Sequence, residues 1–320
     1  VAHFHGHRNS CPIWWVRALA RGDVQLLQPR DLDLTLRQKE RLERLWKRYN
    51  RDPLPTDLRP VIKEMFELDI TADHGPLELP NPFIVASGEM SQDIGQITKA
   101  AEAGWGAVVL RTLAAEDANG NCSLEHLRAK PNAPGTPSHY APGDKHKERP
   151  IVKWYGKVDP RPLSEYLEFA KAAVDIAAPM VVIGSIAAGS DDEWLHTSSL
   201  LRSTGIVFLE NLPTADSPWN LDQMGDKEKE SVIPKLPSGG IYTGFDALNY
   251  IVSGASAVQV YSFLAGKVKT PPKRSFNKFE QVLYTLILEP TEGLIAGLLH
   301  LKNTQGIDSV REAVGVGSNQ

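Results

Sequence analysis

The sequence has little cysteine, no long apolar run and no strong excess of either charge. It contains only two cysteines, Cys11 and Cys122, so a disulfide framework is excluded and a reducing compartment is favoured. No apolar run approaches the roughly 18 residues that a membrane span requires. The formal net charge of −4 gives no overall attraction to nucleic acid. The composition that remains is that of an ordinary globular protein.

What the sequence does have is enough length for one large domain, together with an uneven distribution of charge. Its 320 residues fit one α/β barrel of about 250 residues plus an extension. Residues 1–50 hold ten Lys and Arg against five Asp and Glu, a balance of +5, which leaves −9 for the rest. We therefore expect a basic N-terminal extension and linker over residues 1–60, followed by an α/β barrel over residues 61–320.

Two patterns mark the N-terminal extension. His3, His5 and His7 alternate, and on a strand they would share a face that could bind metal; a solvated terminus is the favoured reading, so we assign no metal ligand. Residues 34–49 have an apolar side that includes Trp46 and a basic opposite face, which predicts an amphipathic helix. That helix either packs on its own domain or meets a protein, a membrane surface or RNA.

After a proline-rich linker at 52–60, β-branched runs alternate with amphipathic helices. This alternation is typical of a parallel sheet with crossover helices. Residues 116–150 interrupt it with no periodicity, and a loop of that length is usually functional or an interaction element. We predict strands over 81–88, 107–113, 179–186, 205–211 and 257–261, and helices over 93–103, 163–176, 191–201, 245–251, 279–301 and 307–314.

The stretch from Pro237 to Phe263 combines a glycine-rich turn, a short helix and a buried strand. Gly239 and Gly240 lack a Cβ, so the backbone there can approach a ligand closely. Turns of this kind in α/β barrels commonly hold a phosphate group. The same two glycines also suit a tight strand-to-helix turn that binds nothing.

Taken together, these segments resemble the dihydroorotate dehydrogenase family, including the related domain of dihydropyrimidine dehydrogenase. The resemblance rests on NPFIVASG at 81–88, AEAGWGAVVLRT at 101–112, SIAAGSDDEWLHTSSLLRSTGIVFLEN at 185–211 and the region 237–314. It implies a TIM (β/α)8-type barrel that binds FMN.

The resemblance also implies contacts with the flavin ring, its phosphate and a pyrimidine-like substrate. Residues 86–88 would lie against the ring, two later turns would hold the phosphate, and Asn211 would contact the substrate. Arg111 stands where the family has a flavin-contacting Lys, and it is either a flavin contact or a structural ion-pair residue. The implied cofactor-binding residues are Ala86, Ser87, Gly88, Arg111, Gly239, Gly240, Tyr261 and Ser262.

The residues do not identify a catalytic base. Cys122 lies in the irregular segment without a visible partner base, so a catalytic thiol is the less favoured reading of it. The resemblance implies a flavin-contacting Lys in the fifth or sixth barrel unit. Lys235 could be that residue only if VIPKL, at 232–236, is the fifth strand.

The chain is also short for a complete barrel. Only 27 residues, 212–238, separate Asn211 from Gly239, whereas each of eight units takes about 30 residues. The fifth and sixth units are therefore missing or degenerate, either because the barrel is open and sealed by a partner or by its own extension, or because a segment is absent from this sequence. An open barrel would expose sheet edges.

Two functions follow from these patterns. The favoured one is a catalytically degenerate member of this class, with FMN either bound or lost, that serves as a structural subunit of a larger assembly. The alternative is an FMN-dependent oxidoreductase acting on the CH–CH bond of a pyrimidine-like substrate. Expected partners are other protein subunits, bound through the extension and the exposed barrel edge, with RNA contact as a further option. Because the chain begins at Val1, a removed organelle presequence is one explanation, and we favour the mitochondrial matrix over the cytoplasm.

Overall fold

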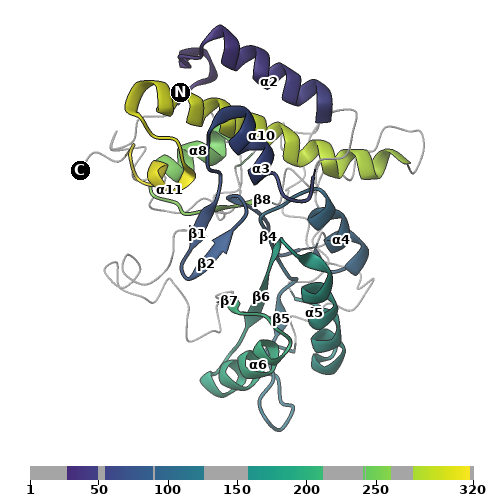
Figure 1. Ribbon diagram of the computed structural model, residues 1–320. Coiled ribbons are helices and arrows are strands. Elements are labelled where there is room, and N and C mark those ends of the chain that lie inside the picture. The colour runs from purple at the N-terminus through teal and green to yellow at the C-terminus, as the bar shows by residue number, and fades with distance from the viewer. Residues whose placement is uncertain are drawn as a thin grey trace, which may run out of the picture.

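The computed structural model describes residues 27–49, 55–88, 91–125, 158–211, 241, 243–260 and 277–317 (Figure 1). Helices and strands alternate along most of this part of the chain. In chain order they are η1 (Pro29–Asp31), α2 (Leu36–Tyr49), α3 (Arg59–Phe66), β1 (Ala72–His74), β2 (Leu77–Leu79), β3 (Phe83–Val85), α4 (Ile94–Glu102), β4 (Ala107–Val109), β5 (Leu113–Ala114), α5 (Leu163–Ala177), β6 (Val181–Ala187), α6 (Asp191–Ser203), β7 (Phe208–Asn211), α8 (Gly244–Val252), β8 (Val258–Val260), α10 (Asn277–Gln305) and α11 (Val310–Ala313).

The larger sheet is parallel at every described pairing. β3 pairs with β4 and β8, while β6 pairs with β4, β5 and β7. Ile183 of β6 pairs with Val109 on one side and Phe208 on the other, so β4 and β7 flank β6. β5 continues β4 along the same edge, but residues 110–112 face only residues 184–185. The predicted strand 107–113 therefore contains a β-bulge.

The order of strands across the sheet is β7-β6-β4-β3-β8, with β5 as the extension of β4. The first four units along the chain thus lie side by side in chain order, and the last strand returns beside the first. Helices α4 and α5 lie to the right of the strands in Figure 1, and α6 lies below them. The predicted α/β class with a parallel sheet is therefore confirmed.

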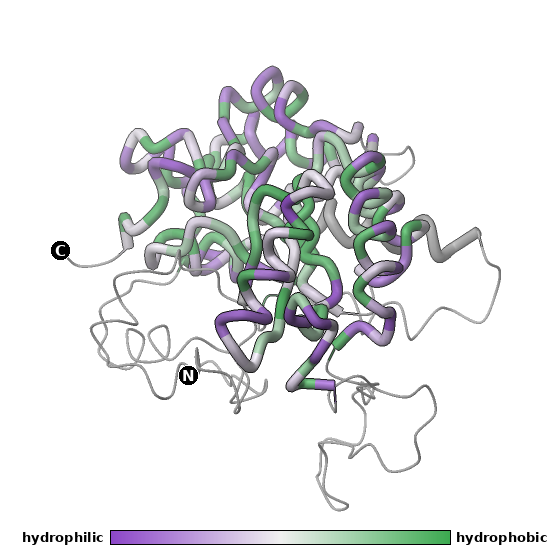
Figure 2. The backbone as a smooth tube through the Cα atoms, turned by 90° about the horizontal axis from the view of Figure 1, so that it is seen from below, coloured by the Kyte–Doolittle hydropathy of each residue, from purple (hydrophilic) through white to green (hydrophobic). Residues whose placement is uncertain are grey.

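Side-chain caps explain where the crossover helices begin. The Asp93 carboxylate accepts a hydrogen bond from the Gln96 backbone N–H at the start of α4. At the start of α6, the Ser190 hydroxyl accepts one from the Glu193 backbone N–H. Thr243 and Asp246 form a reciprocal capping box at α8. Seen from below, hydrophobic segments run through the middle of the described chain, and the surrounding helices alternate hydrophilic and hydrophobic residues (Figure 2).

The extension helix α2 packs on its own domain, against α3 and α10. Leu42 and Leu45 are buried, and Arg41 donates a hydrogen bond to the Met65 carbonyl oxygen at 2.6 Å. Gln38 and Asn303 connect α2 to α10. This confirms the first of the two readings of the amphipathic pattern.

The elements that were not predicted from the sequence include helix α3 and the hairpin of β1 and β2. Helix α3 begins inside the segment interpreted as a linker, because Pro60 near its start has a φ angle already suited to a first helical turn. The proposed division at residue 60 falls inside this helix and stays a prediction. The hairpin β1–β2 turns at Gly75, which has a φ of 58°. Its strands of three residues are too short for a clear alternation.

The closing segment is one 29-residue helix, α10, rather than several helices, and it contains Pro290. It crosses α8 at Gly244, where an added Cβ would lie 1.9 Å from the Pro290 carbonyl oxygen. The glycine is thus required for two backbones to meet. No helix in the described ranges is both long enough and apolar enough to cross a membrane.

Candidate functional site

The predicted site residues that the structure describes gather at the carboxyl ends of the parallel strands. Residues 86–88 follow β3, Arg111 lies in the bulge between β4 and β5, and Asn211 ends β7, where its backbone pairs with Ile186. Ligands of parallel α/β sheets bind outside these strand ends. The edge is therefore the place to look for chemistry.

Three hydroxyl groups from neighbouring strands form a hydrogen-bonded chain at this edge. Ser87 Oγ accepts from the Thr112 backbone N–H at 3.1 Å and shares a second bond of 3.1 Å with Thr112 Oγ1. Thr112 Oγ1 in turn lies 2.9 Å from Ser185 Oγ, and Thr112 and Ser185 are both buried. The polar groups of three strands thus satisfy one another.

Glu210 of β7 continues this chain. Its carboxyl group is hydrogen-bonded to Ser185, and its Oε2 accepts from Gln259 Nε2 of β8 at 2.8 Å. Although the residue as a whole is half-buried, burial of the carboxyl group raises its pKa, and the hydrogen bonds from Gln259 and Ser185 oppose that shift only in part. Glu210 is therefore held toward its neutral form.

The Glu210–Gln259 bond joins two strands that do not pair through their backbones. β7 and β8 are the outermost strands of the described sheet. A second link lies beside the first: the His74 ring of β1 contacts Phe208 of β7 at 5.0 Å between centroids, and its Nδ1 lies 3.1 Å from Ser256 Oγ, just before β8. The sheet must curve strongly for side chains from its two edges to meet in this way.

Arg111 is buried, and its side chain points toward the turn after β3. One guanidinium nitrogen donates to the Gln92 side-chain oxygen, while the Arg111 carbonyl oxygen accepts from the Tyr166 hydroxyl at 2.6 Å. Burial raises the pKa of Tyr166, with the negative charges of Asp159 and Glu210 adding to the shift. The bulge thus fixes Arg111 from both its main chain and its side chain.

Arg161 holds the same turn from the other side. It forms a bidentate ion pair with the fully buried Asp159, with the shorter bond at 2.7 Å, and donates to the Gln92 carbonyl oxygen at 2.9 Å. Its guanidinium carbon lies 3.7 Å from the Phe169 ring centroid, a cation–π contact. Gln92 is therefore clamped between two arginines, and the structure supports a positioning role for both.

The segment around Cys122 is held by structural contacts. Glu193 accepts hydrogen bonds from the Ser123 and Gly189 backbones at 2.6 and 2.8 Å, which ties the segment to the start of α6. Cys122 itself is half-buried and packs against a small apolar cluster that includes Leu124.

In the described half of the predicted flavin site, the backbone and side-chain groups form hydrogen bonds within the protein. The Ala86 N–H donates to the Val260 carbonyl oxygen at 3.2 Å, and the Gly88 N–H donates to Ser91 Oγ at 3.1 Å. Ser87 Oγ is engaged with Thr112, and the Arg111 side chain with Gln92. These groups thus have hydrogen-bond partners within the protein, and the flavin contacts that the resemblance implies stay a prediction.

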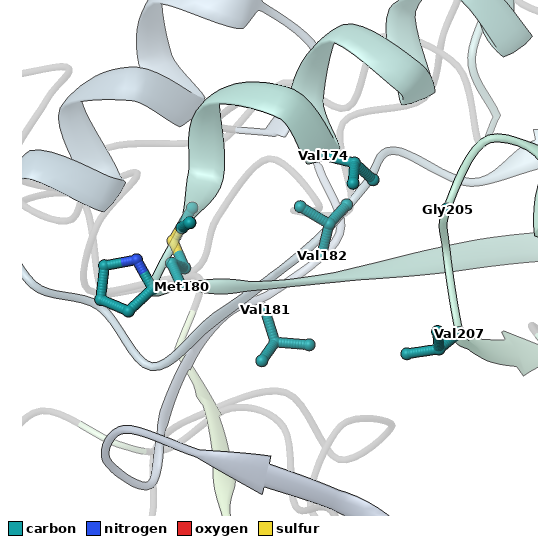
Figure 3. Close-up of a pocket in the computed structure, with 8 residues that line it drawn as sticks. Val174, Met180, Val181, Val182, Gly205 and Val207 are labelled. Carbon is teal, nitrogen blue, oxygen red and sulfur yellow. The ribbon is translucent and has the colours of Figure 1, made fainter.

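The amino-terminal ends of the strands differ in character. A shallow depression of about 210 Å³ lies there, between the end of α5, the start of β6 and the segment before β7 (Figure 3). Carbon side chains dominate its lining, and Val207 is 69 % exposed. Its lining residues are Val174, Ala178, Pro179, Met180, Val181, Val182, Gly205 and Val207.

The sequence did not single out the residues that connect the strand ends. Thr112, Ser185, Glu210 and Gln259 each interrupt an otherwise apolar strand run, and that interruption was the available signal. Gln92 offered no comparable signal. Outside the described residues lie Gly239, Gly240, Tyr261, Ser262, Lys235 and the three N-terminal histidines.

Within the described ranges, no cluster of His, Cys, Asp or Glu could hold a metal ion. Comparison of the chain with protein-family models and with curated proteins gave no match.

Proposed function

We propose that the chain is a catalytically degenerate barrel protein of the dihydroorotate dehydrogenase class that serves as a structural subunit of a larger assembly. The observation that carries this proposal is the Glu210–Gln259 hydrogen bond, because it joins the outer strands through groups that an active site would offer to a ligand. The hydroxyl chain from Ser87 to Ser185 is satisfied in the same way.

The order of the strands supports barrel ancestry. In a closed (β/α)8 barrel, successive strands are neighbours and the last pairs with the first. The described sheet follows this order for β3, β4, β6 and β7, and β8 pairs with β3. Interior side chains of alternate barrel strands share a layer, which is the relation expected of Glu210 and Gln259 as residues of the fourth and eighth strands.

The alternative function is an FMN-dependent oxidoreductase acting on a pyrimidine-like substrate. One observation favours it: Arg111 and the turn after β3 lie at the strand ends where α/β enzymes bind ligands. The engaged backbone donors of Ala86 and Gly88 count against it.

Reconstitution with flavin separates the two functions. Purified protein would be incubated with excess FMN and desalted, and the retained visible absorbance of flavin would be measured. The scaffold proposal expects no stoichiometric flavin in the protein, nor in Arg111→Lys, which restores the residue type of the family. Stoichiometric retention by the unmodified protein would overturn the proposal in favour of the enzyme.

The outer face of α2 is the proposed partner surface of this subunit. Its inner side is already buried through Leu42 and Leu45, so the remaining face is not needed for docking on the domain. Residues 36–49 hold six basic and two acidic side chains, a balance of +4. A face of this charge fits an acidic protein surface. The exposed basic residues on it are Arg37, Lys39, Arg44, Lys47 and Arg48.

Charge reversal tests this surface in the native assembly. Arg37→Glu combined with Arg44→Glu should shift the protein from a large complex to a monomer-sized fraction in size-exclusion chromatography of native cell extract. Lys171→Glu, on the exposed side of α5, is the matched control and should remain in the complex. Loss of the large fraction on ribonuclease treatment would instead assign the surface to RNA. Identical elution of both variants would overturn the proposed surface.

A further inference from the structure

The outer sides of α5 and α6 carry an excess of acidic side chains. The two helices are neighbours, and their exposed residues include five acidic side chains against two basic ones, a balance of −3. The acidic residues are Glu165, Glu168, Asp175, Asp191 and Asp192, and the basic ones are Lys171 and Arg202. We call this surface the acidic face, and the outer face of α2 the basic face.

Several charges on the two faces have no ion-pair partner in the described part of the chain. On the acidic face these are Glu165, Glu168, Asp191 and Asp192, and on the basic face Arg37, Lys39 and Arg44. The acidic residues of the β1–β2 hairpin differ, because Arg311 binds Asp73 at 2.7 Å and Glu78 at 2.9 Å. The charges of the two faces are therefore available to a partner.

Exposed apolar side chains lie on the same two faces. Leu36 at the start of α2 is 74 % exposed, while on the acidic face Leu195 is 64 % exposed and Ile176 is 38 % exposed. Leu195 follows Asp191 by one helical turn, so the two side chains lie on the same side of α6. Each face thus offers apolar area beside its charges, as protein–protein interfaces do.

The spacing of the charges also matches. Arg37 and Arg44 are seven residues apart on α2, and so are Glu168 and Asp175 on α5, which places each pair about 10.5 Å apart along its helix. Both pairs lie along one side of their helix. The planar guanidinium group binds a carboxylate with two parallel hydrogen bonds, so such rows are complementary.

The two faces lie at different ends of the molecule. Figure 1 shows α2 at the top and α6 at the bottom. The basic face of one copy therefore cannot meet its own acidic face, but it can meet the acidic face of a second copy. In a contact of this kind each copy keeps one unused face, so further copies can add until a ring closes or a filament forms.

We propose that the acidic surface bound by α2 is the acidic face of a second copy of this chain, so that copies associate head to tail. This inference rests on the proposed function, whose partner surface it completes.

Sedimentation velocity of the purified chain, freed of nucleic acid with ribonuclease, tests the association. Exposed ion pairs are individually weak and are screened by salt. At about 0.1 M salt the fraction of species larger than a monomer should rise with protein concentration, and the dissociation constant should be about tenfold higher at about 1 M salt. A monomer at every concentration at the lower salt would overturn the inference.

That failure is distinguishable from failure of the proposed function. A chain that is monomeric when pure but elutes in a large complex from native cell extract would keep its role as a subunit, with a different protein as the partner of α2. Stoichiometric retention of FMN would overturn the scaffold role, whereas self-association of the pure chain would still be measured.

Exchange of charges between the faces identifies the contact. Arg37→Glu combined with Arg44→Glu, and separately Glu168→Lys combined with Asp192→Lys, should each raise the dissociation constant about tenfold or more, because like charges then meet. Circular dichroism checks that both variants are folded.

An equimolar mixture of the two variants is the matched control, because each reversed face is complementary to a face of the other variant. The mixture should associate about as tightly as the unmodified protein. Lys171→Glu, which adds negative charge to the acidic face, should lower the dissociation constant severalfold. A mixture that stays monomeric, or variants that associate as the unmodified protein does, would overturn the head-to-tail contact.

Discussion

The two ends of the parallel strands are built from different chemistry. At the amino-terminal ends, hydrocarbon side chains surround a shallow depression, and Gly106 lets the start of β4 pack directly on the Asn81 backbone. At the carboxyl ends, hydroxyl, amide and carboxyl groups lie in a single hydrogen-bonded chain from Ser87 to Gln259. The first end depends on close packing, and the second on mutual satisfaction of polar groups.

This difference bears on function. Enzymes with parallel α/β sheets keep their ligand-binding groups at the carboxyl ends, where packing needs them least. In this chain the polar groups at that end connect strands instead. Structure alone explains why these polar groups can be buried, because each described group of the hydrogen-bonded chain has a partner.

The largest effect is expected from overpacking the amino-terminal end. In Gly106→Ala the new Cβ would lie 2.1 Å from the Asn81 carbonyl oxygen, a backbone atom that cannot rotate away. The free energy of unfolding should fall by about 3 kcal/mol. Urea denaturation followed by circular dichroism measures it. Gly306→Asn, where no atom lies within 4 Å, should cost less than about 1 kcal/mol. Equal costs for the two variants would contradict the packing described.

A smaller effect is expected at the carboxyl ends, where shape can be kept while hydrogen bonds are removed. Thr112→Val leaves the hydroxyls of Ser87 and Ser185 without the partner they share. The free energy of unfolding should fall by about 2 kcal/mol. Thr98→Val removes only a bond to the preceding turn of α4, and it should change the free energy by about 0.5 kcal/mol or less. A tolerated Thr112→Val would mean that the polar chain contributes nothing.

Comparison of the predicted and observed elements shows how much of the fold could be read from the sequence. The alternation of helix and strand located the elements of the parallel sheet, because residue periodicity and capping residues such as Asp93 and Ser190 are local signals. The strand 107–113 was placed correctly, but its bulge was not, since the extra residue is defined only by pairing with β6.

The candidate site was less predictable. The sequence placed Ala86, Ser87 and Arg111 at one edge, and the structure brings them there. It could not show that their donors and acceptors are engaged within the chain, because Gln92, Thr112 and the Val260 carbonyl oxygen approach them only in the folded state. The Glu210–Gln259 contact spans 49 residues and has no local signal.

A still smaller effect, which depends on pH, is expected at His74, whose ring contacts Phe208 of β7. Burial lowers the pKa of His74 below its ordinary 6.5, so the unfolded chain binds more protons than the folded one between these values. The stability that the neutral ring contributes is present above pH 6.5 and is lost as pH falls through the folded pKa. His74→Phe keeps an aromatic ring against Phe208 and removes this loss.

The difference in unfolding free energy between His74→Phe and the unmodified protein should therefore move in favour of the variant as pH falls below 6.5. Denaturation at several pH values measures it. Loss of the hydrogen bond to Ser256 changes the offset of the curve and not its slope. Parallel curves of unfolding free energy against pH for the two proteins would contradict the burial of a neutral ring at position 74.

The most direct test of the connection between the two edge strands is a double-mutant cycle on Glu210 and Gln259. Free energies of unfolding would be measured for Glu210→Leu, Gln259→Leu, the double variant and the unmodified protein, at mildly acidic pH where Glu210 is neutral. A hydrogen bond of 2.8 Å across the sheet predicts a coupling energy of about 1 kcal/mol. Effects that add to within about 0.3 kcal/mol would show that the two strands are not joined by these side chains.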